Sequence, residues 1–338
     1  MRTRLTDLAK HAGVSTATVS RVLNGKPGVS AQTRQAVLTA LDILGYERPE
    51  KLRTAHAGLI GLVVPELENP VFPLFAQEIE STLSQHGYTP LLCSQSPGGT
   101  SEDEYITALL GHEVDGIIFV SGRHADTSAD LERYHQLRSR GLPIVLINGF
   151  APDIDATFIS SNDAASIDLS VEHLAQLGHR KIGLAIVPER FIPAQRKIQA
   201  FIKNMNTRFE AADVTDSVEI SLFSVEGGQA AATALIERGH TAIICGSDLM
   251  ALGALRAART MGLKTPQDVS IVGYDDSLMT GFTDPPLTTV RQPVASMSAA
   301  AVNAILSEIQ RVQAPRTELL FQPELVVRGS TAAVKVPN

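Results

Sequence analysis

The chain has 338 residues, of which 44% are hydrophobic, so it can bury more than one core and its length predicts two or three domains. No stretch approaches the roughly 18 uninterrupted apolar residues of a membrane-spanning helix. The first residues, MRTRLTDLAK, also lack the apolar run of a secretory signal, and we therefore expect a cytoplasmic protein.

The net charge of -7 is unevenly distributed along the chain. Residues 1–57 carry nine Lys and Arg against four Asp and Glu, a net charge of +5, which leaves -12 for the remainder. A basic head on an acidic body fits a phosphate-binding domain attached to a soluble sensor. A solvated basic arm would carry the same charge, so charge alone does not decide between the two.

The first 45 residues show apolar positions at helical spacing, which predicts three short helices. Gly13 ends the first helix. Ser15 can cap a second helix that runs to about residue 24, and Ser30 can cap a third that ends near Gly45. Three short helices with a tight turn between the first two are typical of a small DNA-binding bundle.

From residue 59 onward, short apolar runs alternate with longer amphipathic stretches. The expected strands are 59–64, 90–93, 116–120, 143–147, 181–187, 242–245 and 270–272, and the helix-like segments include 72–86, 164–177, 228–238 and 249–261. This alternation predicts parallel sheets with helices on both faces and ligand sites at the carboxyl ends of the strands. Two such sheets, one before and one after about residue 158, fit the length better than one.

The two cysteines, Cys93 and Cys245, lie far apart inside apolar runs, with no second Cys or His at metal-ligand spacing near either. We expect buried structural thiols, no metal site and no cofactor.

Several motifs follow one another along nearly the whole chain: DLAKHAGVSTATVSRVLNGKPGVSAQTRQAVLTALDILGY, GLIGLVVPELENPVF, VEHLAQLGHRKIGL, SDLMALGALRAARTMGL, DVSIVGYDDS and PPLTTVRQP. In sequence and in order they resemble the lactose-repressor (LacI/GalR) family. The resemblance implies an N-terminal all-α helix-turn-helix head and an α/β sensor of two doubly wound parallel-sheet subdomains, similar to periplasmic binding proteins. We expect a head at 1–45, a shortened hinge at 46–57, a first subdomain at 58–158 and 289–321, a second at 159–288 and 322–331, and a tail at 332–338.

By this resemblance the second helix enters the major groove. Thr16, Ala17 and Arg21 then stand where base edges are reached, and Arg21 has the strongest chemistry because a guanidinium can bond guanine O6 and N7 together. Small side chains such as those of Thr16 and Ala17 also fit a helix surface with little specificity. The remaining polar residues of this segment are expected to act as phosphate contacts and caps: Ser15, Thr18, Ser20 and Asn24.

The hinge departs from the family pattern. Tyr46-Glu47-Arg48-Pro49-Glu50-Lys51-Leu52-Arg53 is four residues shorter than the usual hinge helix, whose leucine enters the minor groove. Leu52 is a candidate for that wedge, and Arg48, Lys51 and Arg53 are candidate phosphate contacts. A plain basic linker is the alternative.

Sugars are bound by side chains that pair with hydroxyls and by aromatic surfaces against the C–H faces of the ring. Asp275 matches the family's ligand-binding aspartate, whereas Asp276 is expected to be structural. Asn148 follows a strand, and Phe72 and Phe223 occupy positions of apolar ligand contacts, although either Phe could be core.

Two further positions limit the transfer of ligand geometry from the family. Lys197 stands where the family often has arginine. A lysine cannot donate two hydrogen bonds in the fixed geometry by which a guanidinium binds two hydroxyls, so Arg196 is a candidate to reach the site instead. Ser247 replaces the usual asparagine and leaves more room. Three short segments resemble a branch of the family that regulates the use of maltose and other α-glucosides: GYERP, RK at 196–197 and TPLLC. The residues themselves do not distinguish a disaccharide ligand from a pentose or a nucleoside.

Two other classes of protein are less consistent with the sequence. A transport-associated sugar-binding protein would need a signal peptide where the basic head stands. An enzyme would need a catalytic motif, and neither nucleotide-binding glycine loops, GxSxG nor HExxH occurs. The sequence therefore predicts a repressor of carbohydrate-utilisation genes that acts on the nucleoid, binds a near-palindromic operator as a homodimer, and responds to a small sugar, or alternatively to a nucleoside or another small metabolite.

Overall fold

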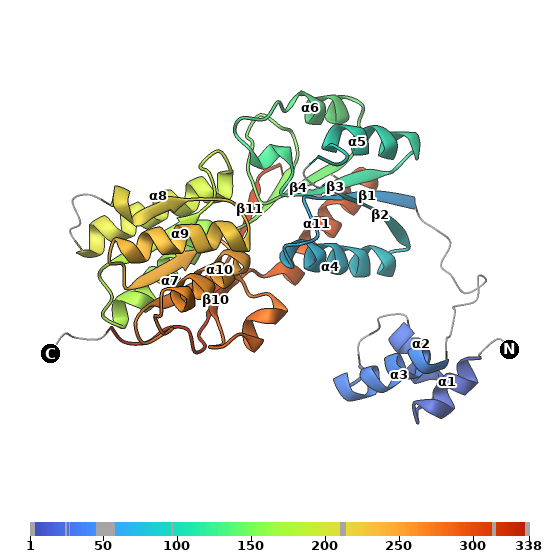
Figure 1. Ribbon diagram of the computed structural model, residues 1–338. Coiled ribbons are helices and arrows are strands. Elements are labelled where there is room, and N and C mark those ends of the chain that lie inside the picture. Colours follow the sequence, from blue (N-terminus) through green and yellow to red (C-terminus); the bar gives the residue numbers. More distant parts are fainter. Residues whose placement is uncertain are drawn as a thin grey trace.

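The computed structural model describes residues 4–23, 26, 28–44, 58–95, 98–209, 214–312 and 316–334. It consists of a small helical head and a body of two α/β lobes (Figure 1). The expected hinge residues Arg48, Lys51, Leu52 and Arg53, and also Asn24, lie outside the described residues.

The head contains three helices, α1 (Leu5–His11), α2 (Thr16–Leu23) and α3 (Ala31–Leu44). Gly13 adopts a φ of +66° after α1, a conformation that costs glycine little and allows the tight turn into α2. Ser15 and Ser30 act as the expected N-caps, since their hydroxyls accept hydrogen bonds from the amides of Thr18 and Thr33. The helices pack around a small apolar core of Leu8, Ala9, Val19, Val22, Val37 and Ala40.

The first lobe is built on a six-stranded sheet with the order β11-β5-β4-β3-β1-β2. Its strands are β1 (Gly58–Val64), β2 (Tyr88–Ser94), β3 (Gly116–Val120), β4 (Ile144–Ile147), β5 (Thr157–Ser161) and β11 (Glu318–Phe321), and all pairings are parallel. Helices α4 (Val71–Gln85) and α11 (Val294–Ile309) cover one face, and α5 (Glu102–Gly111) and α6 (Glu132–Ser139) cover the other (Figure 1).

The second lobe repeats this plan with the order β12-β10-β9-β8-β6-β7. Its strands are β6 (Ile182–Ile186), β7 (Val218–Ile220), β8 (Ala242–Cys245), β9 (Ser270–Asp275), β10 (Thr288–Arg291) and β12 (Glu324–Val326), of which only β12 pairs in antiparallel fashion with its neighbour. Helices α7 (Asp163–Gln176) and α8 (Ile192–Phe209) cover one face, and α9 (Val225–Glu237) and α10 (Asp248–Thr260) cover the other.

The chain crosses between the lobes three times, after Ser161, Arg291 and Phe321, where the sequence predicted crossings at 158, 288 and 321. The difference at the first two arises because β5 belongs to the first sheet and all of β10 belongs to the second. Both strands are short and contain Ser or Thr, so they lack the apolar run that marks the inner strands.

Cys93 and Cys245 are both buried free thiols, as expected, and burial raises the pKa of each. Across the described ranges, no helix has the length and apolarity that a bilayer crossing requires.

Candidate functional site

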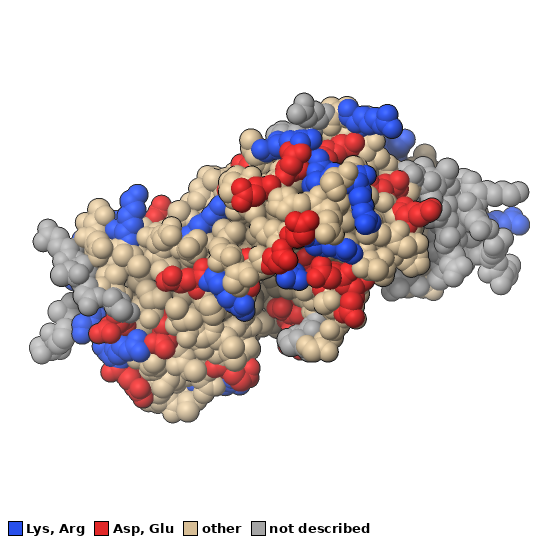
Figure 2. Space-filling view, turned by 90° about the horizontal axis from the view of Figure 1, so that it is seen from above, with Lys and Arg blue, Asp and Glu red and all other residues tan. Residues whose placement is uncertain are grey.

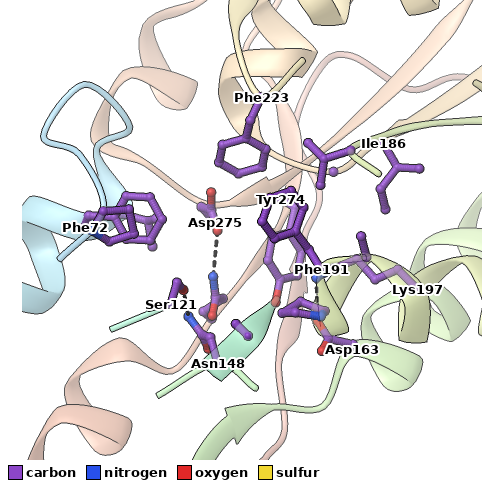
Figure 3. Close-up of a pocket in the computed structure, with 18 of the residues that line it drawn as sticks. Phe72, Ser121, Asn148, Asp163, Ile186, Phe191, Lys197, Phe223, Tyr274 and Asp275 are labelled. Atoms are coloured by element: carbon purple, nitrogen blue, oxygen red, sulfur yellow. Dashed lines mark hydrogen bonds and ion pairs between the residues drawn. The ribbon is translucent and has the colours of Figure 1, made fainter. Parts of the chain in front are cut away.

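A cavity of about 290 Å³ lies between the two lobes, at the carboxyl ends of strands from both sheets. The ends of β1, β3, β4, β6, β8 and β9 meet there, as expected for two doubly wound sheets that face each other. Of the seven candidate ligand residues, the cavity wall contains Phe72, Asn148, Lys197, Phe223 and Asp275 (Figure 3).

The most deeply buried polar group of the wall is Asp275, at the end of β9. Its Oδ1 accepts a 2.6 Å hydrogen bond from Nε2 of Gln292. Among the described residues, no well-formed hydrogen bond reaches its Oδ2 or Oε1 of Gln292, although the side chain of the buried Asn69 lies close enough to Asp275 to favour its charged form. Burial raises the pKa of Asp275 well above its usual value, and the nearby Asp248 adds to the shift. These unpaired oxygens make Asp275 and Gln292 ready to bond the hydroxyls of a ligand.

Asp248 lies behind this wall and is itself well satisfied. Its carboxyl oxygens accept hydrogen bonds of 2.7 Å from the amide of Ser277 and the hydroxyl of Thr289. Burial nevertheless raises its pKa to about 6, against those hydrogen bonds.

Ser121 and Asn148 form a second polar pair, directly after β3 and β4. Nδ2 of Asn148 donates a 3.2 Å hydrogen bond to the hydroxyl of Ser121. Both residues have positive φ, +46° and +65°, as does Asp275 at +115°. Left-handed backbone at non-glycine residues costs free energy and gathers at binding sites, where it turns side chains toward a ligand.

Lys197 reaches the cavity from α8 and forms a buried ion pair with Asp163, the first residue of α7. Its Nζ also lies 4.0 Å from the centre of the Tyr274 ring. Burial disfavours the charged form of Lys197, but the Asp163 carboxylate beside it holds the pKa of Lys197 above the usual value. For Asp163 the balance is the opposite, because burial raises its pKa more than the neighbouring Lys197 lowers it. The pair thus brings charge to the wall without leaving a free cation there.

Four aromatic rings line the cavity, and they come from both lobes: Phe72, Phe191, Phe223 and Tyr274 (Figure 3). Phe72 is 7% exposed and also packs into the first-lobe core, whereas Phe223 is 37% exposed. Paired hydroxyl-bonding groups between aromatic surfaces are what a sugar ring requires.

The structure does not bring Arg196 or Ser247 to the cavity wall. Arg196 points to the first lobe, where its two Nη atoms donate to the Glu318 carboxylate at 2.6 and 2.9 Å. Ser247 is fully buried and caps α10, since its hydroxyl accepts from the amide of Met250 at 3.2 Å. Asp276 is structural, as expected, because it accepts hydrogen bonds from Arg291 and Arg328.

Several wall residues were missed from the sequence, among them Ser121, Asp163, Phe191, Tyr274 and Gln292. Ser121, like Asn148, directly follows an expected strand, so the expectation of ligand sites at strand ends could have found it. Gln292 could not, because β10, which it follows, has no apolar run. Asp163 and Phe191 depend on how helices α7 and α8 begin, which the apolar pattern does not reveal.

The exposed face of α2 is the candidate DNA surface. Thr16, Ala17 and Arg21 are exposed there, whereas Val19 and Val22 are buried on the opposite side. The hydroxyl of Ser15 lies 2.9 Å from that of Thr18, and both therefore help to begin the helix, while Ser20 is half-buried. Figure 2 shows Lys and Arg interspersed with Asp and Glu over the viewed face of the lobes, so that face offers no basic stripe for DNA.

Within the described residues, no group of three or more His, Cys, Asp or Glu side chains could hold a metal ion.

A helix-turn-helix joined to a two-lobed module with a cavity between its lobes defines a ligand-responsive DNA-binding regulator. Residues 4–49 match the sequence profile of bacterial regulatory proteins of the lacI family, and residues 171–331 match that of periplasmic binding protein-like domains. The chain belongs to the lacI family of transcriptional regulators, and the expectation of a non-enzymatic regulator is confirmed.

Close relatives cover almost the whole chain. The HTH-type transcriptional regulator reg1 of Streptomyces lividans is 58% identical over 98% of each chain, and MalR of Streptomyces coelicolor is 57% identical with the same coverage. The solved complex of the regulator CelR with cellobiose superimposes with a TM-score of 0.72 at 28% identity, covering 97% of this chain and 100% of that chain. The lac repressor dimer bound to operator gives 0.69 at 26%, covering 98% and 100%.

Proposed function

We propose that this chain is a homodimeric repressor of carbohydrate-utilisation genes, whose operator affinity is switched by a small sugar bound between the two lobes. It would act in the cytoplasm on the nucleoid. The observation that carries this proposal is the interlobe cavity, where unpaired oxygens of Asp275 and Gln292 face aromatic walls. The remote alternative, a transport-associated sugar-binding protein, has no use for a helix-turn-helix.

Maltose or another α-glucoside is the proposed effector. Support comes from the relative named MalR and from the cellobiose bound to CelR, a disaccharide in a similar fold. The cavity of about 290 Å³ lies just below the roughly 300–1,000 Å³ that small-molecule sites span, which suits one small sugar. A nucleoside or pentose is the second candidate, favoured by the ribose operon repressor of Halalkalibacterium halodurans at 32% identity.

On the DNA side, we propose that α2 lies in the major groove, with Thr16, Ala17 and Arg21 toward base edges and Ser15, Thr18, Ser20 and Asn24 toward phosphates. One short helix reads too few base pairs for selectivity, so two heads on a homodimer would read a near-palindromic operator. The lac repressor structure is such a dimer on operator. Leu52 is proposed as a minor-groove wedge, flanked by Arg48, Lys51 and Arg53 as phosphate contacts.

The proposed switch is a change in lobe closure. Gln292 lies at the second crossing between the lobes and bonds Asp275, so a sugar held by both would contact a connection on which the lobes turn. A change of closure would alter the spacing of the two heads and hence operator affinity, which couples two distinct sites.

The test is fluorescence anisotropy with DNA from upstream of the protein's own gene and its neighbours, titrated against a panel that includes maltose, cellobiose, ribose and nucleosides. Arg21→Ala should weaken specific operator binding by about 1–3 kcal/mol and leave sugar affinity unchanged. Asp275→Ala should abolish the response to the sugar and leave operator binding intact.

The two variants serve as each other's control, because a variant that loses both activities is misfolded. Specific binding that one sugar shifts would establish the function and the effector class. Specific binding shifted only by a nucleoside would replace the sugar, and the absence of specific binding under every condition would overturn the proposal.

A further inference from the structure

Two segments from opposite lobes meet beside the cavity. Asp126 of the first lobe and Phe191 of the second form an antiparallel β-bridge. The amide and the hydroxyl of Thr127 both donate to the carbonyl oxygen of Arg190, at 2.8 and 3.0 Å. Nη1 of Arg190 in turn lies 3.1 Å from Oδ2 of Asp126. We call residues 126–127 and 190–191 the clasp.

The first-lobe side of the clasp is held in place by buried polar groups. Tyr134 donates a 2.5 Å hydrogen bond to Oε1 of Glu102, and its hydroxyl oxygen accepts from the amide of His124. Oε2 of the same Glu102 accepts from the amide of Arg123. Asp126 is fixed further by the amide and hydroxyl of Ser128, at 2.9 and 2.6 Å from its Oδ1. The Asp126 carboxylate is thus presented in one position.

The second-lobe side connects the clasp to the cavity. The guanidinium of Arg190 lies 4.6 Å from the centre of the Phe191 ring, within the range of a cation–π contact. Phe191 lines the cavity, and so does Ala125, the residue before Asp126 (Figure 3 shows Phe191). The clasp therefore contributes one residue, Phe191, to the wall and adjoins another, Ala125, on the opposite lobe.

A second ion pair also spans the lobes, since Arg196 of α8 binds Glu318 of β11. Arg190 and Arg196 flank the beginning of the same helix, α8, which carries Lys197 into the cavity. Opening the cleft would have to break these cross-lobe contacts, whereas the hydrogen bonds within each lobe would survive.

We propose that the clasp encloses the bound effector and sets how long it stays, by holding Phe191, its residue in the cavity wall, against the ligand. This inference rests on the proposed function, because it assigns a role in the retention of the effector. The clasp residues Asp126 and Arg190 do not line the cavity, so their effect on the ligand has to act through lobe closure and Phe191.

The experiment compares full-length wild type with Asp126→Ala, Arg190→Ala and the double variant. Hydrogen exchange of the segment around Thr127 reports the clasp itself, since the Thr127 amide is one of its donors. Stopped-flow dissociation of maltose reports retention, and operator anisotropy without sugar reports the integrity of the head. Arg256→Ala is the matched control, because Arg256 pairs with Glu226 at 3.1 Å within the second lobe.

We expect each clasp variant to exchange faster around Thr127 and to release maltose about 3- to 10-fold faster, with specific operator binding retained. The effect of the double variant should be smaller than the sum of the two single effects, because both single changes remove the same ion pair. The Arg256→Ala protein should match wild type.

Faster exchange with an unchanged maltose dissociation rate would overturn the role in retention, and unchanged exchange would overturn the clasp. If wild type binds no maltose, the proposed effector is wrong. The hydrogen exchange around Thr127 in the first lobe, compared between wild type and the second-lobe variant Arg190→Ala, then still decides whether the clasp holds the lobes together.

Discussion

At the scale of single residues, buried ionisable groups beside the cavity make stability depend on pH. His124 is 1% exposed, and its Nε2 lies 3.1 Å from the carbonyl oxygen of Ile147, to which it donates. Burial lowers its pKa to about 4, against that hydrogen bond, so the folded protein keeps the ring neutral. The ring is therefore a buried neutral donor, one residue before Ala125 of the cavity wall.

His124 yields a prediction with a definite sign. Between about pH 6.5 and 4 the unfolded chain binds a proton at this ring that the folded chain does not, so the free energy of unfolding falls as pH decreases, by up to about 3 kcal/mol. Urea unfolding across this range should show a shallower pH dependence in His124→Gln. The exposed His112, changed to Gln, serves as control, and equal slopes for His124→Gln and wild type would contradict the assignment.

At the scale of elements, α9 and α10 approach each other through glycine. A Cβ at Gly253 would lie 2.1 Å from the carbonyl oxygen of Val225, and one at Gly228 would lie 2.2 Å from that of Met250. Both are backbone atoms that cannot turn aside. Since α9 follows Phe223 and α10 follows Gly246, this close packing sets two loops that line the cavity.

Gly253→Ala should therefore force the two helices apart and lower the free energy of unfolding by about 1–3 kcal/mol or more. Gly111→Ala, in α5 and facing open space, is the matched control and should be neutral or stabilising by up to about 1 kcal/mol. Thermal and urea unfolding measure both, and equal stabilities for the two variants would refute the helix contact as the cause.

At the scale of the whole molecule, the second lobe carries an apolar patch that the body leaves open. It is the short 3-10 helix η4 (Leu278–Phe282), in which Leu278 is 85% exposed, Phe282 84% and Met279 45%. Exposed apolar patches of this kind mark interaction sites. We expect the second copy of the chain to cover it in the proposed homodimer.

The combined variant Leu278→Asp and Phe282→Asp should be a monomer, because two carboxylates on each copy would have to be buried without partners. Analytical ultracentrifugation reads the assembly, and anisotropy should show loss of specific operator affinity. Sugar affinity should persist, since neither residue lines the cavity. A variant that remains dimeric would place the interface elsewhere.

Much of this protein could be derived from its sequence, because the deciding signals are local. The alternation of apolar runs with amphipathic stretches reflects strands buried on both faces, and Ser15, Ser30 and Gly13 mark helix ends through hydrogen bonds and backbone freedom within a few residues. Asp275 and Asn148 each follow a recognisable strand, and the family resemblance singled them out as ligand contacts.

Only the tertiary structure decided which of two adjacent basic residues enters the cavity. Arg196 and Lys197 differ by one position on α8, and the rotation of that helix turns Lys197 to Asp163 and Arg196 to Glu318. The short strands β5, β10, β11 and β12 likewise take their places from pairing with distant segments, which no local pattern encodes. Gln292 and the clasp depend on those long-range pairings, because their partners come together only when two lobes, each made of separate stretches of chain, have packed.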